Sequence, residues 1–120
     1  MRVFRRRALK LNGEGYIHYE LRVEDHSVEI KMTGNDESGS FSDEPISLKD
    51  IARILDIKQD FVTKDFDSLF NDAGNNNNKG FLVAILIDLR LLEKQTNSYV
   101  RNFNYQERLA QLYCGNLEQL

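Results

Sequence analysis

The sequence predicts an α+β fold, in which a three-stranded antiparallel β-meander is followed by a unit of short helices and a small hairpin. Two observations lead to this prediction. In the first third of the chain, apolar and polar residues alternate with a period of two, as is typical of strands with one buried face. After Pro45, the apolar residues adopt helical spacing instead, and this spacing recurs towards the C-terminus.

Length and composition limit the class of protein. The chain has 120 residues, of which 41% are hydrophobic and 29% charged, and this predicts one soluble domain. We expect a meander over 1–44, a helical unit with its hairpin over 45–103, and a C-terminal helix and tail over 104–120. The single cysteine, Cys114, excludes an internal disulfide and favours a reducing compartment. With no signal-peptide pattern and no apolar run of membrane-spanning length, we expect a cytoplasmic protein that does not contact membranes.

The expected meander begins with a less regular strand, Val3–Leu11, which we place at the sheet edge. Alternation is regular over Tyr16–Val23 and again over Val28–Thr33. The turns between these strands fall at Asn12-Gly13 and at the polar run Glu24–Ser27, since Asn, Gly and Asp tolerate the positive φ of hairpin turns.

Helical signals begin at Ser47, which can cap a helix, with Asp50 three residues later. The spacing predicts a first helix over Leu48–Leu55 and a second over Gln59–Phe70. The following run, Asn71–Gly80, is rich in Asn and Gly, and it is expected to form a polar linker.

The C-terminal third contains a segment, Phe81–Leu89, that is apolar on nearly every side and therefore predicts a buried helix. A polar turn then separates two short alternating runs, Leu91–Lys94 and Tyr99–Phe103, which predict a hairpin. The last amphipathic segment, Gln106–Tyr113, would form a helix that closes the core or mediates a homodimer.

Residues 48–67 resemble the helix-turn-helix of bacterial and phage transcription regulators. Ala52 matches the small residue at which the two helices cross, Val62 matches the branched residue that packs on it, and Leu55 and Ile57 flank the turn. More weakly, residues 85–103 are similar to the end of a winged helix-turn-helix, in which a helix leads into a Leu-Leu-Glu strand and a wing hairpin.

The resemblance implies a non-enzymatic regulator that binds nucleic acid and uses neither a cofactor nor a metal. In DNA-binding members, the exposed face of the second helix enters the major groove. The resemblance places Lys58, Gln59, Thr63 and Lys64 of that helix and Asn97 and Arg101 of the wing at the interface. Outside the matched residues, the basic N-terminal side chains of Arg5, Arg6 and Arg7 would add contacts to phosphates. Asp60 and Asp67 on the same helix would repel phosphate, unless one of them accepts from a cytosine amino group.

Two other classes of binding protein remain open. The net charge of −3 and the acidic second helix favour a protein–protein adaptor, in which the helix-turn-helix is only scaffold and the apolar segment Phe81–Leu92 is the contact surface. In that case, a charge at Leu86 or Leu89 would destroy assembly. The acidic clusters at Asp36–Glu44 and Asp56–Asp72 also allow an inhibitor that imitates nucleic acid.

Catalytic signals are weaker than binding signals. His18 and His26 lack metal-ligand spacing with any Cys or His, and Cys114 has no recognisable base near it in the sequence. The sequence therefore predicts a binding protein rather than an enzyme.

Overall fold

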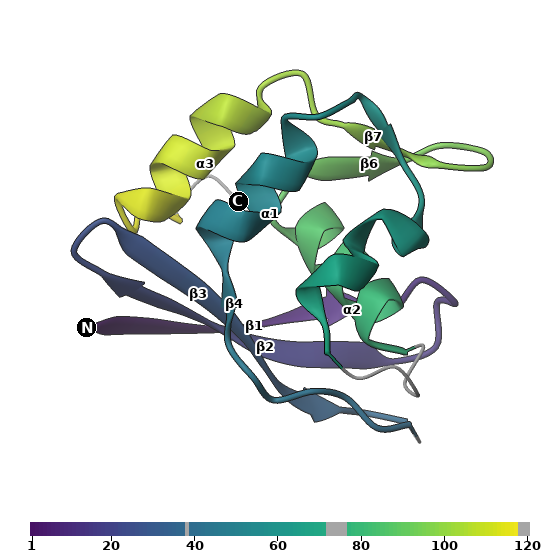
Figure 1. Ribbon diagram of the computed structural model, residues 1–120. Helices are drawn as coiled ribbons and strands as arrows, with labels where there is room; N and C mark the ends of the chain where they lie inside the picture. The colour runs from purple at the N-terminus through teal and green to yellow at the C-terminus, as the bar shows by residue number, and fades with distance from the viewer. Residues whose placement is uncertain (38, 72–76, 118–120) are drawn as a thin grey trace.

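The structure is a computed structural model that describes residues 1–37, 39–71 and 77–117. Two antiparallel sheets and a set of short helices make up the described chain (Figure 1). The elements are β1 (Arg2–Leu9), β2 (Tyr16–Glu24), β3 (Ser27–Asn35), β4 (Ile46–Ser47), α1 (Leu48–Leu55), β5 (Asp60–Phe61), the 3-10 helix η1 (Thr63–Leu69), α2 (Asn77–Asp88), β6 (Leu92–Lys94), β7 (Tyr99–Arg101) and α3 (Tyr105–Tyr113).

The first sheet has the strand order β1-β2-β3-β4. Its first three strands confirm the expected meander, with β1 at an edge and the apolar side chains of β2 and β3 buried on one face. The fourth strand was not predicted, because it has only two residues and follows a long polar loop. The first strand also ends earlier than expected, at Leu9, since the amide of Lys10 already donates to the carbonyl of Gly15 across the turn.

The second sheet is small and has the order β5-β7-β6. Strands β6 and β7 confirm the predicted hairpin, and the turn between them projects beyond the rest of the molecule (Figure 1). Strand β5 pairs with β7 through Asp60 opposite Val100 and Phe61 opposite Tyr99. This short strand completes the sheet and connects the hairpin to α1.

The predicted second helix over Gln59–Phe70 is wrong. The chain forms β5 first, and helical structure begins only at Thr63, as a 3-10 helix. An α-helix would turn Phe61 and Phe66 about 140° apart, at 100° per residue. The strand followed by a 3-10 helix buries both rings instead, with their centroids 5.7 Å apart. Pairing with β7 and burial of both rings thus outweigh the local helical spacing.

Helix α1 confirms the predicted bounds, and the side chain of Ser47 caps it by accepting from the amide of Lys49 at 3.2 Å. Helix α3 begins one residue before the expected start and ends as predicted. Helix α2 begins at Asn77, so the end of the predicted linker is helical; residues 72–76 of that linker lie outside the described residues.

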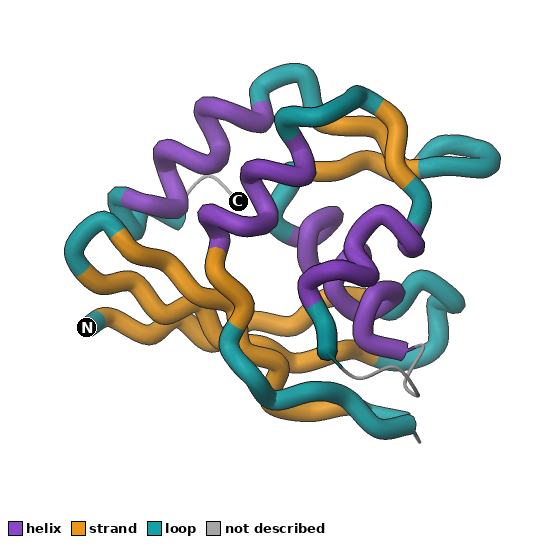
Figure 2. Tube along the Cα trace, viewed as in Figure 1, coloured by secondary structure: helices purple, strands orange, loops and turns teal. Residues whose placement is uncertain are grey.

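Helices α1, α2 and α3 all lie on one side of the four-stranded sheet (Figure 2). Helix α2 contacts β1 and β2 on one side, and η1 and β6 on the other. Its residues Leu82–Leu86 are all buried, because both sides of the helix face other elements. The core is one cluster that joins side chains of the sheet with those of the helices.

Candidate nucleic-acid interface

The helix crossing expected from the sequence does not use Val62. This side chain is 47% exposed, whereas Phe61 and Phe66 on either side of it are 1% and 0% exposed. The buried contact between α1 and the following segment therefore depends on the two rings. Helix α2 would be the DNA-reading helix in another register of the motif, but it offers no surface either, since its central residues are buried against the protein's own sheets.

Lys58 and Gln59 lie in the connection between α1 and β5, and both are exposed. The ammonium of Lys58 is 2.9 Å from the carboxylate of Asp65 and lies over the ring of Phe61. The carbonyl of Gln59 accepts from the backbone amide of Arg101 at 2.8 Å. The two residues thus help to hold the start of η1 and the edge of the small sheet.

Asp65 stabilises the start of η1. Its carboxylate accepts from the amide of Val62 at 2.8 Å as well as from Lys58. Burial alone would raise the pKa of Asp65, but the hydrogen bonds from Val62 and Lys58 outweigh it and lower the pKa below its usual value.

An Asp65→Asn variant should therefore lose stability mainly at neutral pH, by about 1 kcal/mol, as for the loss of a helix cap. A carboxyl with a lowered pKa in the folded state stabilises above its unfolded value of about 3.9. That contribution disappears as the pH falls through the folded pKa. Urea unfolding of both proteins at several pH values between 7 and 2 would measure this. A stability difference that grows towards acid pH would contradict the assignment.

The side chain of Arg101 is held by two structural contacts. Its guanidinium donates to the carbonyl of Leu55 at 2.9 Å and stacks 4.3 Å from the ring centroid of Tyr105. Tyr105 in turn donates to Asp56 at 2.8 Å, and this hydrogen bond raises the pKa of the Tyr105 phenol. Arg101 therefore joins α1, the small sheet and α3, and its side chain is not positioned as a wing contact.

Thr63, Lys64 and Asn97 remain near the surface of the small sheet. Thr63 is half-buried at the start of η1, Lys64 is exposed one residue later, and Asn97 is exposed in the projecting β6–β7 turn. Residue 97 lies beyond the paired positions Phe61 and Tyr99, on the side of the sheet where η1 begins. Of the residues expected at an interface, these three therefore lie together at one end of the small sheet.

Arg5, Arg6 and Arg7 lie on β1, in the other sheet. Arg5 and Arg7 are exposed, with Arg5 3.6 Å from Glu20 and Arg7 stacked 4.2 Å from the ring centroid of Tyr16. Arg6 points the opposite way, into a cluster with Asp88 and Tyr19, where its Nε is 3.1 Å from the Asp88 carboxylate. The alternation of the strand therefore divides the three cations between two faces.

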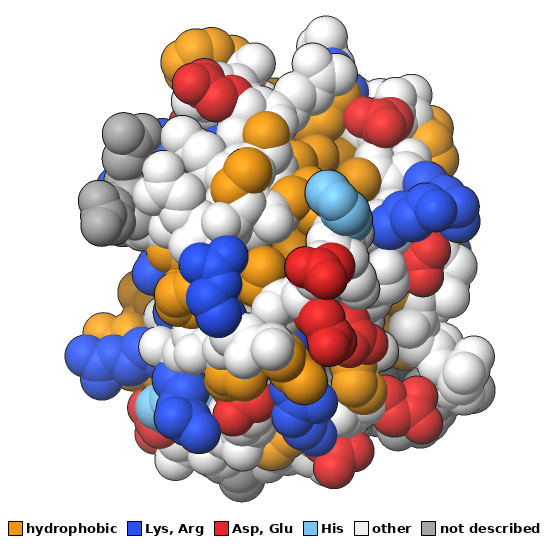
Figure 3. Space-filling model, turned by 90° about the vertical axis from the view of Figure 1, so that its left-hand side faces the viewer, with side chains coloured by type: hydrophobic (Ala, Val, Ile, Leu, Met, Phe, Trp, Pro, Cys, Tyr) orange, Lys and Arg blue, Asp and Glu red, His pale blue; other side chains and the backbone are white. Residues whose placement is uncertain are grey.

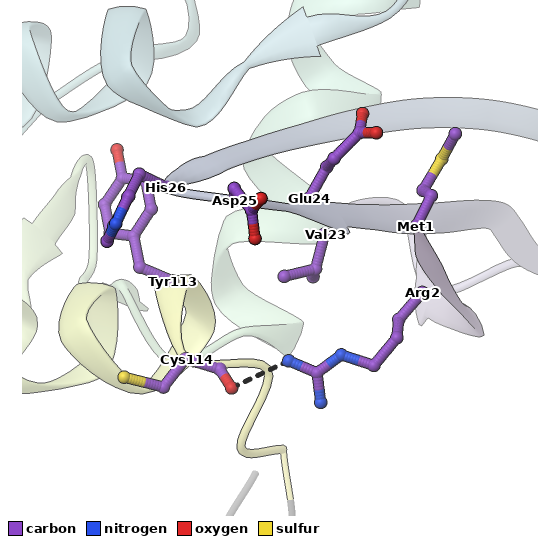
Figure 4. A pocket seen from close by; sticks show the side chains of 8 residues that line it. All are labelled: Met1, Arg2, Val23, Glu24, Asp25, His26, Tyr113 and Cys114. Atoms are coloured by element: carbon purple, nitrogen blue, oxygen red, sulfur yellow. Dashed lines mark hydrogen bonds between the residues drawn. The ribbon is translucent and has the colours of Figure 1, made fainter.

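A second groove lies where the N-terminal strand meets the end of α3 (Figure 4). The guanidinium of Arg2 donates to the carbonyl of Cys114 at 2.9 Å, and the Cys114 sulfur points away from Arg2. A cation at the C-terminus of a helix is favourable because of the helix dipole. The contact that Arg2 makes here is therefore structural.

The sequence did not predict a groove that lies beside the β6–β7 hairpin, next to α3. Arg90, Lys94, Phe103 and Arg108 line it, together with the carboxylate of Glu93. These residues come from the turn after α2, from β6, from the segment before α3 and from α3 itself. Their spacing in the sequence follows no pattern. The groove can therefore be recognised only from the structure, in which the hairpin folds back beside α3.

Comparison with family models, with curated proteins and with solved structures found no match to this chain. Among the described residues, no three His, Cys, Asp or Glu side chains are grouped so that they could hold a metal ion. Within the same part of the chain, no helix has both the length and the apolar character needed to span a bilayer.

Proposed function

We propose that this chain is a regulatory nucleic-acid-binding protein whose residues 45–103 form a winged-helix-like unit. The observation that carries the proposal is the order of elements α1, β5, η1, α2, β6 and β7, with β7 at the centre of the small sheet. Winged helix-turn-helix domains follow the same order, a helix, a short strand, two helices and then the wing hairpin. The projecting β6–β7 turn corresponds to the wing (Figure 1).

The mode of binding differs from insertion of a reading helix into the major groove. Helix α2 has the position of that helix, but its buried residues leave no face for base edges. We place the contact at the same end of the small sheet as the wing, with Lys64 on phosphate and Asn97 in the wing turn. Lys64 suits this role because it is exposed and, among the described residues, is in no ion pair.

The adaptor hypothesis loses the surface on which it depended. Leu86 and Leu89 are both 0% exposed, so the apolar segment is part of the core. A charge at either position would unfold the protein rather than disrupt an assembly.

Mimicry of nucleic acid also finds less support. Acidic residues of both clusters have partners within the protein. Asp36 is 2.6 Å from the imidazole of His18, and Asp65 and Asp67 pair with Lys58 at 2.9 Å and Lys79 at 3.3 Å. On the face that carries the β2–β3 turn, basic and acidic side chains are interspersed around an apolar patch (Figure 3). A mimic needs a continuous ridge of one sign instead.

Fluorescence anisotropy with labelled duplex DNA of mixed sequence, titrated at several salt concentrations, tests the proposal. We expect binding that weakens as salt rises, because cations that contact phosphates release counterions. Lys64→Gln should reduce the slope of log K against log salt by about 0.9, as for one lost phosphate contact. Lys49→Gln, an exposed cation on α1, is the matched control and should leave the slope unchanged. Absence of binding, or binding that ignores salt, would refute the proposal.

A further inference from the structure

The groove beside the hairpin is strongly basic for a protein with a net charge of −3. It has a volume of about 520 Å³, and we call it the basic groove. Three cations, Arg90, Lys94 and Arg108, line it with a single carboxylate, Glu93. Such a volume is within the range of ligand-binding clefts in proteins.

Two of the three cations of the basic groove are available to a ligand. Arg90 and Lys94 are exposed, and neither takes part in an ion pair within the described chain. Arg108 is half-buried and donates to the amide oxygen of Gln111 at 3.2 Å, which holds its guanidinium in place. The carboxylate of Glu93 accepts from the side-chain amide of Asn102, a neutral group, at 3.2 Å.

Arg90 occupies a backbone position that favours glycine. Its φ is +61°, two residues after the end of α2, where the amide of Leu91 donates to the carbonyl of Leu86 at 2.9 Å. This is the Schellman pattern that ends many helices, and glycine is usual at its left-handed position. An arginine here costs stability, and residues held in such conformations are enriched at functional sites.

Phe103 supplies an aromatic surface at the same place. Its side chain is 94% exposed, the most exposed large hydrophobic residue among the described ones. Next to it, the buried side-chain oxygen of Asn104 accepts no hydrogen bond in the described structure. An exposed ring stacks on a nucleobase, and an amide oxygen accepts from an N–H group of a base.

We propose that the basic groove binds single-stranded nucleic acid. Phosphates lie against Arg90 and Lys94, and one base stacks on Phe103. An unpaired strand fits better than a duplex because stacking on a side chain requires a base with a free face. The inference rests on the proposed function in that both need a nucleic-acid partner, but it uses different residues from Lys64 and Asn97.

Fluorescence anisotropy with a labelled oligothymidylate of about 12 nucleotides, within the usual site sizes of single-strand binders, tests the groove. Phe103→Ala should weaken binding about tenfold, the effect of one lost stacking contact. Arg90→Gly combined with Lys94→Gln should reduce the slope of log K against log salt by about 1.4, from two lost phosphate contacts on a single strand.

Two controls separate loss of binding from loss of folding. Arg90→Gly alone should raise the midpoint of thermal unfolding, because glycine relieves the left-handed backbone, while it weakens binding. Lys49→Gln and Ile57→Ala change an exposed cation and a 75% exposed apolar side chain elsewhere, and both should bind as the wild type does.

The outcomes distinguish the groove from the proposed function. If the groove variants bind oligothymidylate as the wild type does, the proposed role of the basic groove is wrong. The same follows if the protein binds duplex DNA but no single strand. In both cases the proposed function still stands. Failure to bind either nucleic acid overturns both. If polyglutamate displaces the oligonucleotide and Phe103→Ala binds normally, the groove recognises acidic polymers by charge alone, and the single-strand assignment is wrong.

Discussion

Phe66→Ala should lower the free energy of unfolding by about 3–5 kcal/mol, the usual cost of removing a buried ring from a core. Phe66 is 0% exposed on η1, and this 3-10 helix contacts both α1 and α2. Its ring also packs against Phe61 of β5, with the centroids 5.7 Å apart. Loss of the ring therefore opens a cavity where three elements meet, and packing around such a cavity relaxes only in part.

Val62→Ala is the matched control for this prediction. Val62 is the residue that the helix-turn-helix resemblance places at the crossing, but it is 47% exposed. Its truncation should change the free energy of unfolding by no more than about 0.5 kcal/mol. Urea unfolding followed by circular dichroism measures both variants. If both variants lose the same free energy of unfolding, Val62 packs on Ala52 as the resemblance implies, and the packing of Phe61 and Phe66 described above is wrong.

Asp88→Ala should have the second largest effect, a loss of about 2–3 kcal/mol. Asp88, at the end of α2, receives the Nε of Arg6 at 3.1 Å and a short hydrogen bond from the hydroxyl of Tyr19. Burial, together with the hydrogen bond to Asp88, raises the pKa of the Tyr19 phenol well above its usual value. The carboxylate thus connects α2 to β1 and β2, and its removal leaves a half-buried guanidinium without its counter-charge. We expect less than for a fully buried pair, because both side chains are 25% exposed.

Asp50→Ala tests whether that effect comes from the partly buried position. Asp50 also pairs with an arginine, Arg53 at 3.4 Å, but the two side chains are 52% and 69% exposed. Its loss should cost less than about 1 kcal/mol. A double-mutant cycle of Arg6→Ala and Asp88→Ala measures the coupling directly. Additive losses would mean that the ion pair does not join α2 to the sheet.

Local signals alone predict several elements, because their information is contained in a few neighbouring residues. Alternation over β2 and β3 places one face in the core, and a shift by a single residue would expose that whole face. Ser47 determines the start of α1 through a hydrogen bond to a residue two positions away. The hairpin β6–β7 follows from two alternating runs separated by a polar turn.

The segment from Lys58 to Phe70 shows where local signals are insufficient. Its apolar spacing is compatible with a helix, yet β5 forms because strand β7, about forty residues later, supplies its backbone partners. Helix α2 shows the same limit: its apolar surface predicts burial but does not identify what covers it, and β1 and β2 from the opposite end of the chain do so.

The candidate sites depend even more on the tertiary structure. The sequence placed nine basic, polar and hydroxyl side chains at an interface. Two of them, Arg6 and Arg101, instead join distant elements of the fold. The basic groove instead collects Arg90, Phe103 and Arg108, which no sequence pattern connects. The sequence by itself determined the fold class, the meander, the hairpin and α1, since these depend on short-range spacing and capping. Only the tertiary structure decided which cations face solvent, because that depends on pairing and packing between segments far apart in the chain.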